Sequence, residues 1–323
     1  MDSHTETLLN INDLRVYFYT YSGTVRAVDG VDLRVGDSEI TGIVGESGSG
    51  KSTLAFAVMR LLPLKARIVT GTIIFEGQDL ASLSEDNVRH VRGRKISMVF
   101  QDPLSFLNPV MKIGDQIAES MKGLQQQEAE ERAIDLLQKV GIPRPREITH
   151  EYPHQLSGGM RQRVLIAIAM ASNPSLLIAD EPTTALDVTV QAQILELLKE
   201  LSKKTKTSIM LITHDLGVIA ETCDRVYVMY GGKIMEYGGV TNVFENPLHP
   251  YTFALLASAL SIQEFKEDLV GIPGEIPNLM DPPAGCRFHP RCPKAKAICA
   301  KKEPELEVHE AGHGVRCWLY AQE

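Results

Sequence analysis

The sequence has no apolar run long enough to cross a membrane. Its longest apolar stretches, such as 164–171 and 253–260, are far shorter than the roughly 20 residues that span a bilayer. The N-terminal residues 1–6 also lack the basic and apolar regions of a secretory signal. We therefore expect a chain that works in the cytoplasm, where disulfides are rare.

Low-complexity segments and repeats at solenoid spacing are absent too. The 323 residues are 44% hydrophobic and 23% charged, an ordinary composition that allows a large core and two or three substructures. The formal net charge of −8 argues against broad binding to nucleic acid. Cysteine is scarce, but four of the five cysteines lie close to the C-terminus: Cys286, Cys292, Cys299 and Cys317.

What the sequence does contain is a phosphate-binding loop. Residues 45–52 read Gly-Glu-Ser-Gly-Ser-Gly-Lys-Ser and match the pattern G-x-x-x-x-G-K-[ST]. The apolar run 40–44 before the loop predicts a buried strand, and 53–60 after it predicts a helix. The glycines let backbone N–H groups converge on a phosphate, and the start of the helix favours its charge. A Gly/Ser-rich turn that fits by chance is the alternative, which the flanking strand and helix disfavour.

We expect this loop to bind a nucleotide. Lys51 is predicted to reach the β- and γ-phosphates, and the Ser52 hydroxyl to bind Mg²⁺. The other predicted contacts of the loop are Gly45, Glu46, Ser47, Gly48, Ser49, Gly50 and Thr53. Aromatic side chains on the strand predicted over 8–18 either enter the core or stack on the adenine ring. For stacking, Phe18 is the first candidate and Tyr19 the second.

Polar side chains end three apolar runs farther along the chain: Gln101, Asp180 with Glu181, and His214. Buried parallel strands read as such runs, and open α/β sheets bind ligands at the carboxyl ends of their strands. We expect Asp180 to hold Mg²⁺ through water and Glu181 to orient or deprotonate an attacking water. The alternative for the two carboxylates is a solvated acidic turn.

Between these runs the pattern becomes helical. Over 113–140, apolar side chains recur at helical spacing among Glu and Gln, which predicts a small helical subdomain inserted into the α/β core. The insert ends in Leu-Ser-Gly-Gly-Met at 156–160. Ser157 is there a predicted N-cap whose neighbouring N–H groups are placed to bind an anion, and a plain helix cap is the alternative.

In this order the motifs resemble the ATP-binding-cassette (ABC) ATPases over roughly residues 8–245. The elements are the phosphate loop, Gln101, Leu-Ser-Gly-Gly-Met at 156–160, Asp180-Glu181, Ala185-Leu186-Asp187 and His214. The resemblance implies an α/β fold: a P-loop (RecA-like) ATPase core with an antiparallel β-subdomain, an inserted helical subdomain and a small cysteine-containing C-terminal extension. The implied domains are 1–101 with 164–245 for the nucleotide-binding core, 102–163 for the insert and 246–323 for the extension.

The resemblance also implies roles at the phosphates. ATP and Mg²⁺ are the cofactors, and Ser52, Gln101 and Asp180 lie near the metal. Gln101 links this site to a membrane partner, and His214 contacts the γ-phosphate. The implied catalytic residues are Lys51, Gln101, Glu181 and His214.

A second cassette completes the site in this family. By resemblance, two cassettes pack head to tail, and Ser157, Gly158 and Gly159 of one contact the nucleotide of the other. Asp187 then lies at the seam between them. The residues leave open whether the second cassette is a copy of this chain or a related one.

Further stretches resemble the dipeptide/oligopeptide/nickel importer branch: 101–103, 107–109, 152–155, 191–194 and 246–252. This implies an ATPase subunit at the cytoplasmic face of the cell membrane. Its partners are transmembrane permease subunits and, indirectly, an extracytoplasmic solute-binding protein, with no nucleic acid. A soluble cassette ATPase acting on DNA or ribosomes is the alternative, but the coiled coil, zinc modules or second cassette of such proteins are not in the sequence. Whether a peptide or nickel is carried stays open.

The segment 103–109 after Gln101 is apolar and bounded by prolines. An exposed Leu/Phe pair there is a poor surface for a monomer but a suitable socket for a helix of the membrane partner. The alternative is that Phe106 and Leu107 pack inward.

The four late cysteines have the spacing C-x5-C-x6-C-x17-C. Because cytoplasmic disulfides are rare and four free thiols are a liability, we expect a metal centre. Four thiolates suit Zn²⁺ or an iron–sulfur cluster, and the close cysteine pairs of zinc sites are missing. The resemblance to peptide importers, whose C-terminal regions can carry a [4Fe-4S] cluster, favours the cluster over Zn²⁺. Cys223 is expected to be an ordinary buried thiol.

Overall fold

The computed structural model describes residues 7–121, 123–184, 186–263, 272–310 and 312–321. The chain folds into two compact units, one from 1–83 and 212–323, the other from 84–211. The second unit is therefore inserted in the sequence of the first. β8 (Ser208–Thr213) begins in the second unit and returns the chain to the first. The finer domain boundaries expected from the sequence stay predictions.

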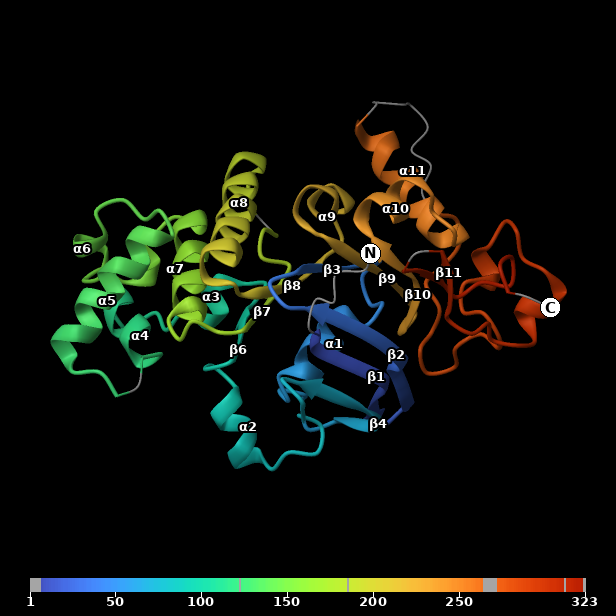
Figure 1. The fold of residues 1–323 in the computed structure, drawn as a ribbon, viewed down its shortest axis with the longest axis horizontal. Coiled ribbons are helices and arrows are strands. Elements are labelled where there is room, and N and C mark those ends of the chain that lie inside the picture. The colour runs from blue at the N-terminus through green and yellow to red at the C-terminus, as the bar shows by residue number, and fades with distance from the viewer. Residues whose placement is uncertain (1–6, 122, 185, 264–271, 311, 322–323) are drawn as a thin grey trace. The chain divides into compact units, whose positions relative to one another are not determined.

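An antiparallel sheet opens the first unit. Its strand order is β2-β1-β4-β5, with β1 (Thr7–Thr20), β2 (Gly23–Gly36), β4 (Ala66–Phe75) and β5 (Gln78–Asp79). Residues 21 and 22 join β1 and β2 as a hairpin (Figure 1). Leu9 and Ile11 of β1 are fully buried, as period-two alternation demands, and an irregularity after Ile11 moves the buried positions to Leu14 and Val16. The strand pair predicted over 8–18 and 25–35 is confirmed.

A second set of strands in the same unit carries the phosphate loop. β3 (Ile40–Val44) runs parallel to β9 (Arg225–Tyr230), which pairs antiparallel with β10 (Lys233–Gly239). β12 (His313–Val315) and β11 (Glu307–Glu310) continue from β10, each antiparallel to its neighbour. All five residues of β3 are buried, as expected of a parallel strand covered on both faces.

Helices and aromatic side chains complete the first unit. They are α1 (Lys51–Val58), α9 (Leu216–Thr222), α10 (Val240–Glu245), α11 (Pro250–Gln263), η2 (His289–Arg291) and η3 (Ala297–Ala300). The C-terminal extension shares the core of this unit, because Phe288 packs against Tyr230 and Tyr251 with ring centroids 5.3 Å from each. Burial of aromatic rings from Tyr251 and Phe288 anchors the extension to β9.

The second unit combines parallel strands with the helical insert (Figure 1). β6 (Ile96–Val99) runs parallel to β7 (Leu176–Asp180), and β8 is the next neighbour of β7. The helices are α2 (Glu85–Val91), α3 (Pro103–Phe106), α4 (Ile113–Glu119), α5 (Gln126–Lys139), α6 (Pro145–Ile148), η1 (Pro153–Gln155), α7 (Gly158–Met170) and α8 (Val188–Thr205). The helical pattern over 113–140 is thus divided between α4 and α5, and Gly123, with φ at 96°, lies in the break.

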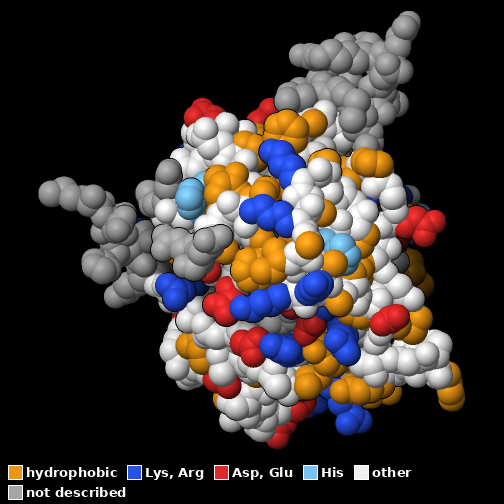
Figure 2. Space-filling model, turned by 90° about the vertical axis from the view of Figure 1, so that its right-hand side faces the viewer, with side chains coloured by type: hydrophobic (Ala, Val, Ile, Leu, Met, Phe, Trp, Pro, Cys, Tyr) orange, Lys and Arg blue, Asp and Glu red, His pale blue; other side chains and the backbone are white. Residues whose placement is uncertain are grey.

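The surface carries charges of both signs. Figure 2 shows one face, on which Lys and Arg side chains lie among acidic and hydrophobic ones without a broad field of one sign. Within the described ranges, no helix is both long and apolar enough to cross a membrane.

Candidate nucleotide-binding site

The backbone of the phosphate loop requires glycine at two positions. Gly50 has φ at 105°, and a Cβ there would collide with the carbonyl oxygen of Ala27. A Cβ at Gly45 would collide with the carbonyl oxygen of Met229 on β9. Only glycine lets the loop turn this closely against its neighbours, so the pattern read from the sequence has a physical cause in the structure.

Helix α1 starts inside the loop. Gly50 is its N-cap and offers no side-chain acceptor, and the first turn has no acidic residue. The N–H groups of this turn are therefore the kind of donors that bind phosphate oxygens. Lys51 is only 5% exposed, and its Nζ donates to the carbonyl oxygens of Gly45 at 2.7 Å and Glu46 at 3.0 Å. The Lys51 ammonium group thus connects the start of α1 to the first two residues of the loop.

The other predicted residues of the first unit lie at strand ends. His214 directly follows β8 and is exposed, and the next residue, Asp215, caps α9 by accepting from the N–H of Gly217 at 2.8 Å. Phe18 and Tyr19 lie near the end of β1, the first half-buried and the second exposed. Their contacts with a nucleotide stay predictions.

In the second unit, strand register brings Gln101 and Glu181 together. Val99 of β6 pairs with Ala179 of β7, so the residues two positions later leave the sheet side by side. Nε2 of Gln101 donates to Oε2 of Glu181 at 2.8 Å. Oγ1 of Thr184 donates to the same oxygen at 2.9 Å, a contact that sequence reasoning missed because nothing in the spacing marks it. Two donors therefore orient the Glu181 carboxylate.

The backbone at this edge is unusual. Asp180, 4% exposed, ends β7, and Glu181 after it adopts a left-handed conformation with φ at 48°. Non-glycine residues in this region cost of order 1–3 kcal/mol and are found most often at functional sites. This conformation turns the chain directly after β7, where the Glu181 carboxylate meets Gln101 and Thr184.

The Leu-Ser-Gly-Gly segment begins α7 next to the start of α8 (Figure 1). Oγ of Ser157 accepts from the N–H of Met160 at 3.3 Å, and Oδ1 of Asp187 accepts from the N–H of Val190 at 3.0 Å. A Cβ on Gly159 would lie 2.7 Å from Cγ1 of Val190, so glycine permits the close approach of the two helices.

These contacts gather the residues that were predicted to act across a dimer. Ser157, Gly158, Gly159 and Asp187 lie together in one unit. The predicted N-cap at Ser157 is confirmed. Ala185, quoted with Leu186 and Asp187 in the sequence motif, lies outside the described residues.

The apolar segment after Gln101 is exposed only in part. Phe106 is 50% exposed, and its ring stacks on Phe100 with centroids 3.7 Å apart. Leu107 is 3% exposed, so the inward alternative holds for this residue and not for Phe106. Leu104 and Val110 remain largely exposed beside it.

The predicted metal centre is not supported. Cys286, Cys292, Cys299 and Cys317 lie near one another: burial raises the pKa of Cys286 to about 12, and the three other thiols add to the rise. However, among the residues described, no group of three or more His, Cys, Asp or Glu is arranged to hold a metal ion. Two of the four thiols instead help to fill the apolar core. Cys223, expected to be a buried thiol, packs against the same core and is only partly buried.

Comparison with known proteins decides the family. The family model described as "ABC transporter" matches residues 28–184, and "Oligopeptide/dipeptide transporter, C-terminal region" matches 235–299. The oligopeptide transport ATP-binding protein AppD of Bacillus subtilis (strain 168) is 50% identical over 321 residues, which cover 98% of each chain. The chain belongs to the ATP-binding proteins of ABC transporters, in their oligopeptide/dipeptide branch.

Two further relatives of this ABC ATPase agree. The dipeptide transport ATP-binding protein DppD of the same bacterium is 47% identical over 321 residues, covering 98% of this chain and 96% of DppD. A dimeric structure of the ATP-binding cassette MJ0796 in a post-hydrolysis state, bound to ADP and Pi, has a TM-score of 0.65 and 26% identity over 72% of this chain and 98% of its own. The ABC ATPase fold with an antiparallel β-subdomain and a helical insertion is therefore confirmed.

Proposed function

We propose that this chain is the ATP-hydrolysing subunit of a peptide importer. The observation that carries the proposal is similarity along nearly the whole chain to oligopeptide and dipeptide transport ATP-binding proteins. The second family match, at 235–299, lies beyond the cassette match and is described for peptide transporters. A cassette acting on DNA or ribosomes finds no comparable support.

In the proposed mechanism the phosphate loop holds ATP. The N–H groups of the loop and of the start of α1 bind phosphate oxygens, and Lys51 moves its donors from the loop carbonyls to the β- and γ-phosphates. Ser52, Asp180 and Gln101 supply hydroxyl, carboxylate and amide oxygens, the hard donors that Mg²⁺ prefers. When bound, Mg²⁺ neutralises charge on the phosphates.

Glu181 performs the hydrolytic step by orienting or deprotonating water, and His214 contacts the γ-phosphate. The hydrogen bonds from Gln101 and Thr184 to Glu181 support this, because they fix one carboxylate oxygen and so hold the group in a single orientation. Gln101 then connects the reacting water to the apolar segment that follows it. The adenine ring stacks on Phe18 or Tyr19.

We further propose that two cassettes work as a pair. Ser157, Gly158 and Gly159 begin α7 beside Asp187 at the start of α8, and this surface binds the nucleotide held by the other cassette. The solved dimer of a related cassette supports a pair of this kind. Exposed Leu104, Phe106 and Val110 form the surface for a permease subunit, which holds the chain at the cytoplasmic face of the membrane.

A cluster on the four C-terminal cysteines stays a prediction, and no step of the proposed function passes through it. Metal analysis of anaerobically purified protein tests it. Iron with acid-labile sulfide, lost in Cys292→Ser, would establish a [4Fe-4S] cluster, and stoichiometric zinc would establish the alternative. Protein with neither metal would remove the metal centre.

Uptake of labelled di- and oligopeptides tests the function itself. Cells lacking this chain should lose uptake, and the wild-type chain should restore it and co-purify with polytopic membrane subunits. Restored uptake of nickel alone would redirect the proposal to another solute. ATPase activity stimulated by DNA or ribosomes, without co-purifying membrane subunits, would overturn it.

A further inference from the structure

A residue of the phosphate loop is held by side chains from far along the chain. Nη1 of Arg291 donates to Oε2 of Glu46 at 2.8 Å, and Nη2 donates to Oε1 at 3.1 Å, a two-pronged pair across 245 positions. The backbone N–H of Glu46 donates to Oη of Tyr251 on α11 at 3.0 Å. Both the side chain and the backbone of Glu46 are thus held by residues C-terminal to the cassette match.

Arg291 is fixed for this contact. Its guanidinium has five N–H donors. Besides the two on Glu46, they reach the carbonyl oxygens of Pro273 at 2.9 Å and Ile272 at 3.0 Å and Oη of Tyr230 at 3.3 Å. The side chain is only 4% exposed. A planar group with every donor engaged holds one orientation, which a lysine does not reproduce.

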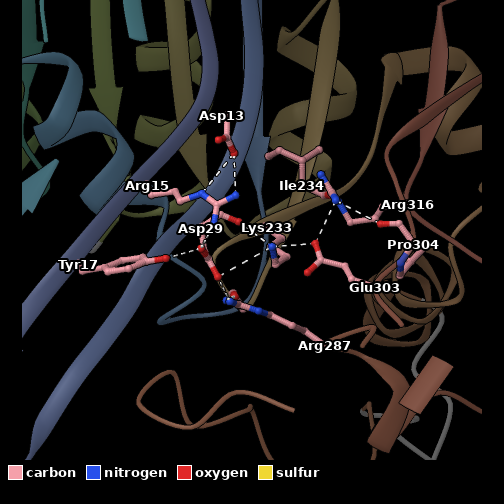
Figure 3. A network of polar contacts seen from close by, with 11 residues as sticks. Asp13, Arg15, Tyr17, Asp29, Lys233, Ile234, Arg287, Glu303, Pro304 and Arg316 are labelled. Carbon is pink, nitrogen blue, oxygen red and sulfur yellow. Dashed lines mark hydrogen bonds and ion pairs between the residues drawn. The ribbon is translucent and has the colours of Figure 1, made fainter. Parts of the chain in front are cut away.

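A second contact reaches the other end of the loop. Arg287 donates to the carbonyl oxygen of Gly231 and pairs with Asp29, whose carboxylate also meets Tyr17 and Lys233 (Figure 3). The next residue, Gly232, donates its N–H to the carbonyl oxygen of Ser49 at 2.9 Å. The extension therefore supports the loop at Glu46 directly and at Ser49 through the turn between β9 and β10.

The charge of Glu46 makes this support matter for nucleotide binding. A carboxylate inside a phosphate-binding loop repels an incoming triphosphate, and the repulsion is strong where water is partly excluded. Arg291 neutralises this carboxylate and engages both of its oxygens, while Tyr251 holds the N–H at the same residue. If these residues only packed the extension onto the unit, neither an ion pair with Glu46 nor a hydrogen bond to the loop backbone would be needed.

We propose that Arg291 and Tyr251 are positioning residues for the nucleotide, so that the C-terminal extension is a working part of the phosphate site. They act through Glu46 and do not touch the phosphates. The inference rests on the proposed nucleotide site at 45–52. It predicts that ATP affinity depends on the charge balance between Glu46 and Arg291.

Titration of the full chain with labelled ATP and ADP tests this. Arg291→Gln should weaken ATP binding about tenfold, and ADP binding less, because the unpaired carboxylate repels the larger charge more strongly. The ATP deficit should shrink as salt is raised. Glu46→Gln added to Arg291→Gln should restore most of the affinity, since no unpaired charge remains.

Arg316→Gln is the matched control. Arg316 is also a buried arginine of the extension, and it donates to Glu303 at 3.1 Å and to the carbonyl oxygens of Ile234 and Pro304, without contact to the loop. This variant should keep wild-type ATP affinity. If Arg291→Gln does not fold, Tyr251→Phe serves instead: it removes the acceptor for the Glu46 N–H, keeps the ring, and should weaken ATP binding two- to threefold, roughly the effect of one hydrogen bond.

The outcomes distinguish a failure of the positioning role from a failure of the proposed nucleotide site. Lys51→Ala should lose ATP binding, and if it does not, the nucleotide site itself is wrong. Lost binding in Lys51→Ala with wild-type binding in Arg291→Gln and Tyr251→Phe would overturn the positioning role alone. An equal, salt-independent deficit in Arg291→Gln and in the double variant would mean that packing, not charge, explains the contact, and would also overturn it.

Discussion

The phosphate loop and the C-terminal extension are built in opposite ways. The loop is a run of consecutive residues whose shape depends on the backbone, with Gly45 and Gly50 placed where no Cβ fits. The extension is attached by side-chain pairs between distant segments, such as Arg287 with Asp29 and Arg291 with Glu46. A site shaped by consecutive backbone can be recognised in a sequence, whereas attachment by long-range pairs leaves no spacing to read.

The largest effect is expected where the backbone determines the shape of the phosphate loop. Gly50→Ala places a left-handed alanine against the carbonyl of Ala27 and should cost about 4 kcal/mol of unfolding free energy, with loss of ATP binding. Gly48→Ala is the control, because φ is also positive there, at 75°, but the Cβ meets nothing within 4 Å. It should cost about 1 kcal/mol. Equal costs in urea unfolding would show that the close contact is unimportant.

The next largest effect is expected where buried ion pairs attach the C-terminal extension. Burial alone would raise the pKa of Asp29, but the Tyr17 hydroxyl and the cations Lys233, Arg287 and Arg15 outweigh it and hold the pKa below its usual value. This carboxylate is therefore ionised at neutral pH and balances buried cations.

Asp29→Asn should accordingly lower the unfolding free energy by about 3 kcal/mol, because Lys233 and Arg287 lose a buried partner. Asp13→Asn removes a more exposed partner of Arg15 and should cost less than about 1 kcal/mol. Urea unfolding at neutral pH measures both. Similar values for the two variants would contradict a buried ionic attachment of the extension.

A smaller effect is expected in the pH dependence of stability, through the buried ring of His249. Burial lowers the pKa of His249, just before α11, to about 4, against partial compensation by Glu236. Its Nδ1 accepts from the N–H of Tyr251 at 3.0 Å, which requires an unprotonated nitrogen. Nearby, Nε2 of His313 lies 2.7 Å from Oε1 of Glu236.

Above pH 6.5 the His249 ring is neutral in both the folded and the unfolded chain, and its contribution to stability is complete. As the pH falls from 6.5 to 4, the unfolded chain gains a proton that the folded chain excludes, so stability is lost.

This window gives a measurable slope. Between pH 7 and pH 5, His249 should account for about 2 kcal/mol of lost unfolding free energy. His249→Asn keeps an acceptor for the Tyr251 N–H without the titration, so the decline should become shallower by that amount. An unchanged slope in urea unfolding across this range would show that His249 is not the group responsible.

The sequence predicted the parts of the molecule that depend on local pattern. The glycine-dependent turn at 45–50, the buried strand 40–44 and the cap at Ser157 follow from residue types at short spacing, and the structure confirms them. The pairing of Gln101 with Glu181 was expected only as convergence at a sheet edge, and it needed the register of β6 and β7 to become a contact.

What the sequence could not predict depends on long-range contacts. Four clustered cysteines in a chain expected in the cytoplasm favoured a metal centre, but the described structure shows thiols that share an apolar core and no metal-holding group. The pair of Glu46 with Arg291 was missed. Glu46 lies in a stretch that was recognised by its glycines and Lys51, and Arg291 lies in a stretch that was recognised by its cysteines. Only the fold of the extension onto the unit that holds the loop brings them together.

The central claim is that this chain hydrolyses ATP with Glu181 and binds it with the loop. Parallel measurement of ATP affinity and ATPase turnover in Glu181→Gln tests it most directly. Affinity should stay at the wild-type level while turnover falls by about two orders of magnitude or more, the size expected for loss of a general base or water-orienting group. Near-normal turnover in this variant would contradict the account.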